Sequence, residues 1–170
     1  MFDFIISFLQ ILKSTWQIWI FILSFGLFFI LVEYLFKWLE ELKTKKWFKE
    51  HKTLEEWKKV DSRKFEKITA IIFKNLGYKT KVVGGARDWG IDIIAKKDGK
   101  RIFIQCKRMD KISPGAIREF YGSIVNRLKE GEKGIFVTTG KFSEEGREFI
   151  RDKPIELIDG IKLEKLASQF

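Results

Sequence analysis

The stretch that decides the fold runs from Gly90 to Lys107 and reads GIDIIAKKDGKRIFIQCK. Two runs rich in isoleucine and other strand-forming residues flank the pair Asp98-Gly99, and this pair is the strongest short-range signal for a two-residue hairpin turn. The register that follows from such a turn places Asp92 opposite Gln105. The sequence therefore predicts an antiparallel hairpin whose two strands are paired in a defined register.

Three polar side chains lie near the open end of this hairpin: Asp92, Gln105 and Lys107. Side chains alternate between the two faces of a strand, so the register predicts all three on one face. The opposite face is apolar beyond the turn, and its residues are Ile91, Ile93, Ala95, Ile102, Ile104 and Cys106. The hairpin is therefore expected to gather an acid, an amide and an amine at one place.

This cluster suits metal and phosphate chemistry. Asp92, with the Gln105 amide or the backbone carbonyl of Cys106, offers the oxygen ligands that Mg²⁺ prefers. Such a metal lowers the pKa of a bound water and neutralises charge on a phosphate. Lys107 is then placed to hold the attacking water or to stabilise developing negative charge. An ordinary Asp–Lys pair on a partly solvated sheet face is the alternative.

The segments around the hairpin predict an α/β domain. Asp61 or Ser62 begins a helix whose apolar residues recur at helical spacing. Glu66 lies on that helix and is a further candidate metal ligand, directly or through a water. Two more helices are expected to begin at Ser113-Pro114 and at Ser143, and a short one closes the chain. Further strands are expected at 79–83, 134–138 and 155–158, which gives a mixed central sheet with helices on both faces.

The N-terminal region predicts a membrane anchor. The segment from Trp16 to Leu35 is almost wholly apolar, with Glu33 as its one charged residue, and about 20 such residues are needed to cross a bilayer. Five lysines follow this segment between residues 37 and 49, whereas Lys13 alone precedes it, so the C-terminal domain is expected in the cytoplasm of a single-pass protein of the cell membrane. A cleavable signal peptide is a weaker alternative, because Asp3 stands where such peptides carry basic residues and no A-x-A-like cleavage site follows.

These patterns predict three parts: an anchor at 1–38 with its span at about 16–35, a helical connector rich in charged and aromatic residues at 39–60, and a globular domain at 61–170. The connector is expected either to lie near the lipid headgroups or to form a stalk that packs on a second copy.

Charge and cysteine content narrow the chemistry. Residues 61–170 carry 24 Lys and Arg against 16 Asp and Glu, and such an excess attracts polyanions, above all nucleic acid. Cys106 and His51 are the single cysteine and the single histidine, which excludes an intrachain disulfide and a Cys/His zinc site built by this chain alone. The basic residues expected to contact DNA phosphates are Arg87, Arg108, Lys111 and Arg118.

The order of the motifs resembles a known family. The pairs and triplets Phe65-Glu66, Leu76-Gly77-Tyr78, Gly90-Ile91-Asp92 and Gln105-Cys106-Lys107 are similar to the Mrr-type restriction endonuclease domain of the PD-(D/E)xK nuclease superfamily. The later segments GIFVTTGKFSEEGREFI and IELIDGIKL match its usual continuation, so the resemblance covers about Asp61 to Leu166.

The resemblance implies a fold and a set of roles. The fold is a mixed β-sheet between helices, of the restriction-endonuclease-like α/β/α kind. Asp92 corresponds to the metal-binding acid, Lys107 to the catalytic lysine and Glu66 to the helix glutamate that helps to bind metal. Gln105 stands where most relatives in the superfamily have Glu or Asp, which removes one negative charge from the metal site. Asp88 in the preceding loop is also a common family feature.

The resemblance further implies Mg²⁺-dependent hydrolysis of DNA phosphodiester bonds, with Mn²⁺ as a substitute and no small-molecule cofactor, often in defence against foreign DNA. The sequence thus predicts a membrane-anchored endonuclease whose partners are DNA and the lipid bilayer, with a homodimer left open. A non-cleaving module that tethers DNA or a partner at the membrane is the alternative. A membrane sensor in which the span does the signalling is a third interpretation.

Overall fold

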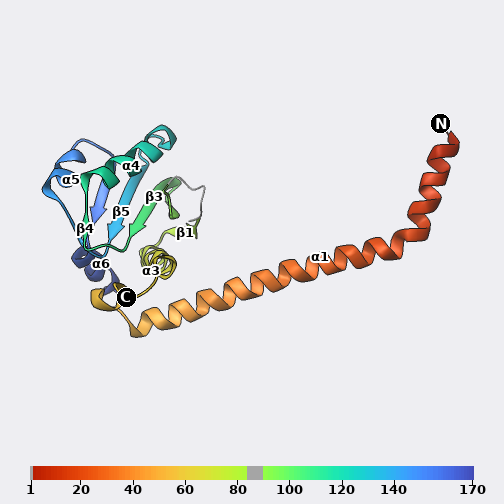
Figure 1. Ribbon diagram of the computed structural model, residues 1–170, viewed down its shortest axis with the longest axis horizontal. Helices are drawn as coiled ribbons and strands as arrows, with labels where there is room; N and C mark the ends of the chain where they lie inside the picture. Colours follow the sequence, from red (N-terminus) through yellow and green to blue (C-terminus); the bar gives the residue numbers. More distant parts are fainter. Residues whose placement is uncertain (1, 84–89) are drawn as a thin grey trace. The chain divides into compact units, whose positions relative to one another are not determined.

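The computed structural model describes residues 2–83 and 90–170 of the 170-residue chain (Figure 1). The chain divides into two compact units, Met1–Lys43 and Thr44–Phe170.

Helix α1 spans Phe2–Glu50. Its part up to Lys43 forms the first unit, and its last turns belong to the second unit. The part of α1 from Lys13 onward is long and apolar enough to cross a membrane, and the apolar side chains from Trp16 to Leu31 are exposed. The apolar segment at residues 2–12 continues the same helix without a break.

The second unit is built on a five-stranded sheet with the strand order β1-β2-β3-β5-β7. Strands β1, β2 and β3 are antiparallel neighbours, whereas β3, β5 and β7 run parallel. Their bounds are Lys79–Val82, Ile93–Lys97, Lys100–Lys107, Lys133–Thr138 and Ile155–Ile158. The mixed sheet predicted from sequence is confirmed. A second, two-stranded parallel sheet of β4 (Lys111–Ile112) and β6 (Lys141–Phe142) was not predicted.

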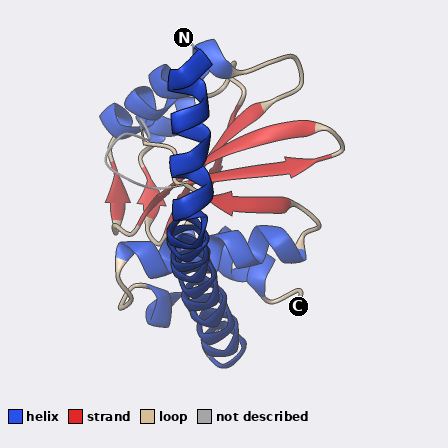
Figure 2. Ribbon diagram, turned by 90° about the vertical axis from the view of Figure 1, so that its right-hand side faces the viewer, coloured by secondary structure: helices blue, strands red, loops and turns tan. Residues whose placement is uncertain are grey.

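Helices cover both faces of the main sheet (Figure 2). One face packs against α2 (Leu54–Trp57), α3 (Ser62–Asn75) and α6 (Gly160–Ala167). The other face packs against α4 (Pro114–Ile124), which the 3₁₀ turn η1 (Val125–Arg127) follows directly, and against α5 (Glu144–Phe149). The domain therefore has the three-layer α/β/α architecture that the sequence predicts.

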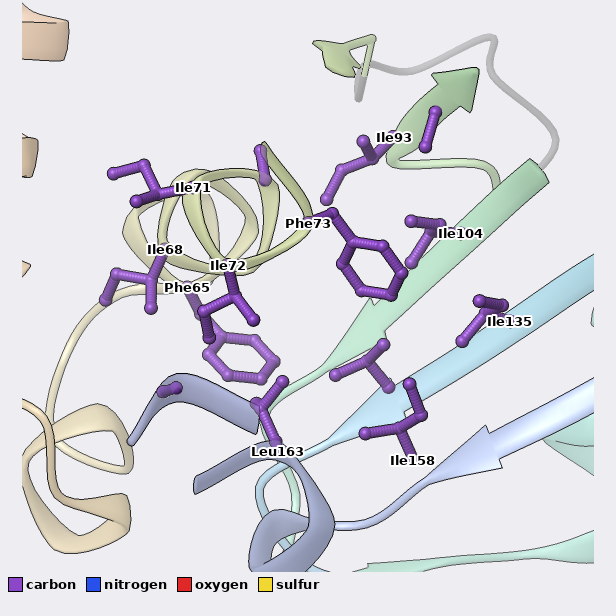
Figure 3. Packing of buried hydrophobic residues seen from close by; sticks show 14 of the residues in the cluster. Phe65, Ile68, Ile71, Ile72, Phe73, Ile93, Ile104, Ile135, Ile158 and Leu163 are labelled. Atoms are coloured by element: carbon purple, nitrogen blue, oxygen red, sulfur yellow. The ribbon is translucent and has the colours of Figure 1, made fainter. Parts of the chain in front are cut away.

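Each layer has its own apolar core. On the α3 side, the side chains of Phe65, Ile72, Ile93, Ile104 and Leu163 are buried against one another (Figure 3). On the α4 side the buried residues include Ile91, Phe103, Ile117, Phe120 and Phe136. The prediction that Ile91 shares the face of Ile93 is therefore wrong, because Ile91 precedes strand β2 and packs in the core on the α4 side.

Local signals in the sequence account for the element ends. Asp61 begins α3, where its carboxylate accepts a hydrogen bond from the backbone N–H of Lys64 at 2.8 Å. Ser113 and Ser143 cap α4 and α5 in the same way, as predicted. Asp98 and Gly99 both have positive φ, 52° and 79°, which is the backbone of a type I′ hairpin turn.

The segment predicted as a helical connector is only partly helical. Helix α1 ends at Glu50, and the four-residue helix α2 follows after a break. Trp57 is fully buried, Phe48 and Val60 are nearly so, and all three belong to the core on the α3 side. Burial of these apolar side chains folds the second half of the segment onto the domain.

Candidate active site

The open end of the hairpin departs from regular pairing at Asp92. The last registered pair is Ile93 with Ile104, yet the backbone N–H of Asp92 also donates to the Ile104 carbonyl, at 2.9 Å. Two consecutive residues thus face one residue of β3, as in a β-bulge, and bulges redirect side chains next to functional sites. The expected direct pairing of Asp92 with Gln105 in a regular ladder is therefore wrong.

The Asp92 carboxylate is held by strand β3. Its Oδ2 accepts a hydrogen bond from the backbone N–H of Cys106 at 2.7 Å. The sequence suggests the backbone carbonyl of Cys106 as a candidate metal ligand, whereas the observed bond uses its N–H with Asp92 as the acceptor. The bond orients the carboxylate at the carboxyl end of β3.

Glu66 extends from α3 towards the same place. Its side chain is half-buried, and burial together with the negative charge of Asp92 raises the pKa of the Glu66 carboxyl above its usual value. Two carboxylates that disfavour each other's charge indicate a place where a cation would relieve the repulsion. The charge of Asp92 thus acts on Glu66, and a metal site shared by the two acids stays a prediction.

Cys106 lies between these two acids and the core. Burial, and then the charges of Asp92 and Glu66, raise the pKa of its thiol well above the usual value. The thiol is therefore neutral at physiological pH and lacks the thiolate that a nucleophile needs. Its side chain packs against the core on the α3 side, which makes it a structural residue.

Gln105 and Lys107 point to the other face of β3, because side chains alternate along a strand. Gln105 is buried, and its Oε1 has no hydrogen-bond partner in the described part of the chain. Gly90, with φ of 74°, lies close to it: a Cβ there would come within 3.1 Å of Gln105 Nε2. Lys107 is half-buried at the end of β3, where it pairs in register with Thr138 of β5.

These groups fit a divalent cation. Within residues 2–83 and 90–170, no three His, Cys, Asp or Glu side chains gather closely enough to form a metal cluster by themselves. The carboxylates of Asp92 and Glu66 are nevertheless hard oxygen donors, and the buried amide oxygen of Gln105, on the other face of β3, has no partner among the described residues. Mg²⁺ commonly takes one or two protein carboxylates and keeps several waters, so the donor set suits such an ion.

The predicted DNA-contact residues belong to different elements of the domain. Arg87 and the loop residue Asp88 lie outside the described residues. Arg108, just beyond β3, donates through Nη1 to the Lys58 carbonyl at 2.6 Å, which ties it to the segment after α2. Lys111 begins β4, and Arg118 of α4 lies over the ring of Phe149, 5.5 Å from its centroid.

One organising residue was not singled out from the sequence. Thr138 ends β5, and its hydroxyl donates to the Met109 carbonyl at 3.0 Å and accepts from the Gly140 N–H at 3.1 Å. It thereby joins the loop after Lys107 to the loop after β5. The signal was the polar triplet Thr138-Thr139-Gly140 directly after a buried parallel strand, where α/β folds place their sites.

The chain was compared with known protein families, curated proteins and solved structures. The family model Mrr_cat, described as a restriction endonuclease, matches residues 57–167. No curated protein matches the chain. Similar solved structures include the MspJI restriction endonuclease in complex with a 27-mer oligonucleotide, at 24% identity and a TM-score of 0.46, over 60% of this chain and 26% of that one.

Two further structures are similar. A repair endonuclease from Pyrococcus abyssi matches at 19% identity and a TM-score of 0.40, over 52% of this chain and 43% of that one. The protein AF1548, of unknown function, matches at 20% identity and a TM-score of 0.49, over 60% of this chain and 64% of that one. The chain thus spans less than two thirds of each of these proteins.

Proposed function

Because the chain belongs to the Mrr_cat restriction endonuclease family, we propose that it is a membrane-anchored DNA endonuclease that hydrolyses phosphodiester bonds with Mg²⁺, in the restriction of foreign DNA. The observation that carries the proposal is the placement of Asp92. Its carboxylate is fixed by the Cys106 N–H and lies close enough to Glu66 to raise the pKa of that acid.

In this proposal Asp92 and Glu66 hold the metal, with the Gln105 amide oxygen and the Cys106 carbonyl as further candidate ligands. The bound metal supplies a water of lowered pKa and neutralises charge on the phosphate. Lys107 contributes its ammonium group to the charge that develops on the phosphate oxygens. The Cys106 N–H keeps Asp92 in place, and the neutral Cys106 thiol packs against the core on the α3 side.

The membrane anchor is the second part of the proposal. Support comes from α1, which is long and apolar enough to span a bilayer, and from the lysines that follow its apolar segment. The excess of lysine after the span favours a cytoplasmic position for the nuclease domain. DNA that enters the cytoplasm would then meet the enzyme at the membrane.

Plasmid cleavage tests the enzymatic part. The full chain in neutral detergent is incubated with supercoiled plasmid and Mg²⁺, Mn²⁺ or excess EDTA. We expect nicking with either metal and none with EDTA. If the wild type cuts no faster than Asp92→Ala, the endonuclease assignment is wrong.

A non-cleaving DNA tether is the second candidate, and Gln105 is the observation that favours it. An amide at this position leaves the metal site with one negative charge fewer than a third carboxylate would provide. A tether predicts DNA binding that weakens with salt, is unchanged by Asp92→Asn, and is never followed by strand breaks.

A further inference from the structure

A pocket of about 570 Å³ lies within the unit Thr44–Phe170, between the end of α1 and the end of α3. Four lysines line it: Lys45, Lys49, Lys52 and Lys74. Phe48 of α1 and Ile71 of α3 form an apolar floor. This lysine pocket takes no part in the candidate active site.

The charged side chains that line the lysine pocket all have the same sign. Its lining within the described residues contains four cationic side chains and no acidic one. Lys49 and Lys74 lie in the last turns of α1 and α3, where the helix dipole favours a cation. The helix dipole accounts for a lysine at the end of each helix separately. It does not account for the fact that both helix ends and Lys52 line the same pocket.

One lysine of the pocket forms a hydrogen bond with a main-chain oxygen of the same chain. Lys52 Nζ donates a hydrogen bond to the main-chain oxygen of Phe170, whose ring contributes to the lining and is 43% exposed. The hollow thus combines lysine donors that engage oxygen with an apolar floor and an exposed aromatic ring. An amphiphile with an anionic head matches both features.

We propose that the lysine pocket binds the headgroup of an anionic phospholipid of the membrane in which the chain is anchored. Clusters of four or more basic residues just beyond a span attract anionic lipids. Lys45 follows Leu35 by only ten positions in the sequence, so the lysines of the pocket begin just after the predicted span. A DNA backbone would pair with the lysines but leave the apolar floor uncovered. The inference rests on the proposed membrane anchor.

Lipid binding by the full chain tests this site. The protein in neutral detergent is titrated with phosphatidylglycerol, phosphatidylcholine or inorganic phosphate. Native mass spectrometry then measures the fraction of protein that carries each ligand, and hence its affinity. The pocket variant is Lys49→Gln/Lys74→Gln. The matched control, Lys43→Gln/Lys46→Gln, removes the same charge from α1 outside the pocket lining.

We expect phosphatidylglycerol to bind more tightly than phosphatidylcholine or phosphate, and the pocket variant to lose roughly 30-fold in affinity, since each lysine near an anionic lipid contributes about one factor of five. The control variant should bind nearly as the wild type does. Equal losses in the two variants would show attraction by juxtamembrane charge in general and overturn the site. Phosphate that competes as well as the lipid would also overturn the assignment.

Two other readouts keep this result separate from the proposed function. A short DNA duplex that displaces phosphatidylglycerol, with an affinity lost in the pocket variant, would assign the pocket to DNA instead. Plasmid cleavage by the pocket variant in detergent should equal that of the wild type. Retention of the wild-type chain in alkali-washed membranes tests the anchor. Failure of cleavage leaves the measured lipid affinity as an independent result, whereas failure of the anchor overturns the assignment to a lipid of the same membrane.

Discussion

The backbone N–H of Cys106 donates to Oδ2 of Asp92 at 2.7 Å, so one strand of the hairpin holds the acid of the other in place. Asn in place of Asp92 keeps an oxygen that can accept this bond but removes the negative charge. We therefore expect Asp92→Asn to fold as the wild type does and to lose cleavage by about 100-fold or more, because removal of even an indirect partner of a metal ligand costs about 10–100-fold. Plasmid nicking and the midpoint of thermal unfolding measure the two effects.

The matched control is Asp98→Asn, the same change at the turn of the same hairpin. Asp98 has a φ of 52°, a conformation that Asn adopts readily, so both stability and cleavage should stay near wild type. Equal cleavage by the two variants would contradict the role of Asp92.

Glu66 is expected to lower the stability of the metal-free chain at neutral pH. Its folded-state pKa is raised, first by burial and then by the charge of Asp92, so the associated stability is present at low pH and lost as the pH rises through the folded-state pKa. Glu66→Gln should therefore unfold at a higher temperature than the wild type at pH 7 without metal, and the difference should disappear near pH 4.

Addition of Mg²⁺ should raise the unfolding temperature of the wild type and leave that of Glu66→Gln almost unchanged, because binding stabilises only a chain that holds the ion. Glu119→Gln, a change at an exposed position of α4, serves as the control. A Glu66→Gln chain that gains as much as the wild type from Mg²⁺ would remove Glu66 from the metal site.

Lys107 is expected to act on the reaction and not on metal binding. Lys107→Ala should lower the cleavage rate by roughly 100-fold to 1,000-fold, the range seen when one group that stabilises transition-state charge is removed. The rise in unfolding temperature with Mg²⁺ should remain. Lys100→Ala, an exposed position at the other end of β3, should cut as the wild type does.

The hairpin illustrates which structural features could be predicted from the sequence and which could not. The pair Asp98-Gly99 sufficed to predict the register from Lys97–Lys100 to Ile93–Ile104, because positive φ at both positions is encoded locally. The bulge at Asp92 was not predicted. The bulge depends on long-range packing, because Ile91 is buried in the core on the α4 side. The residue types at 91–93 carry no local signal for a bulge.

Part of the candidate site could be predicted from local sequence signals in the same way, but the burial of individual side chains could not. Asp92 and the Cys106 backbone were named from the hairpin register, and Glu66 from its place on the helix. The contact between Asp92 and Cys106 follows from the pairing of the two hairpin strands, and α3 packs in the same core as the Cys106 side chain. Trp57 was assigned to a charged connector, because its neighbours are Lys and Glu, yet it is fully buried. Composition averages over a segment, whereas burial is decided side chain by side chain.

Glu132 forms a structural ion pair that should govern acid stability. Its buried carboxylate accepts from Arg101 Nε at 2.8 Å and from the Lys129 N–H at 3.0 Å, and these bonds, led by the one to Arg101, lower its pKa to about 2. A depressed pKa contributes stability above the ordinary carboxyl pKa that is lost as the pH falls from about 4.5 towards about 2.

We expect Glu132→Gln to lower the free energy of unfolding at pH 7 by on the order of 2 kcal/mol, since each pKa unit corresponds to about 1.36 kcal/mol and the partly exposed Arg101 weakens the pair. Urea unfolding at pH 7 and pH 3 measures this. Glu148→Gln, which breaks an exposed ion pair with Arg151, should change stability by less than about 0.5 kcal/mol at either pH.

Two glycines should respond to alanine in opposite directions. A Cβ at Gly140 would lie 2.1 Å from the Asp110 carbonyl oxygen, a backbone atom that cannot move without shifting the loop that follows Lys107. Gly140→Ala is therefore expected to destabilise the domain by about 2 kcal/mol or more and to lower cleavage with it. Gly122 lies inside α4 on an exposed face, and a Cβ there would meet no atom within 4 Å, so Gly122→Ala should stabilise by about 0.5–1 kcal/mol. Thermal unfolding of the two variants side by side checks both signs, and a neutral Gly140→Ala would show that the two loops are not packed as tightly as the structure has them.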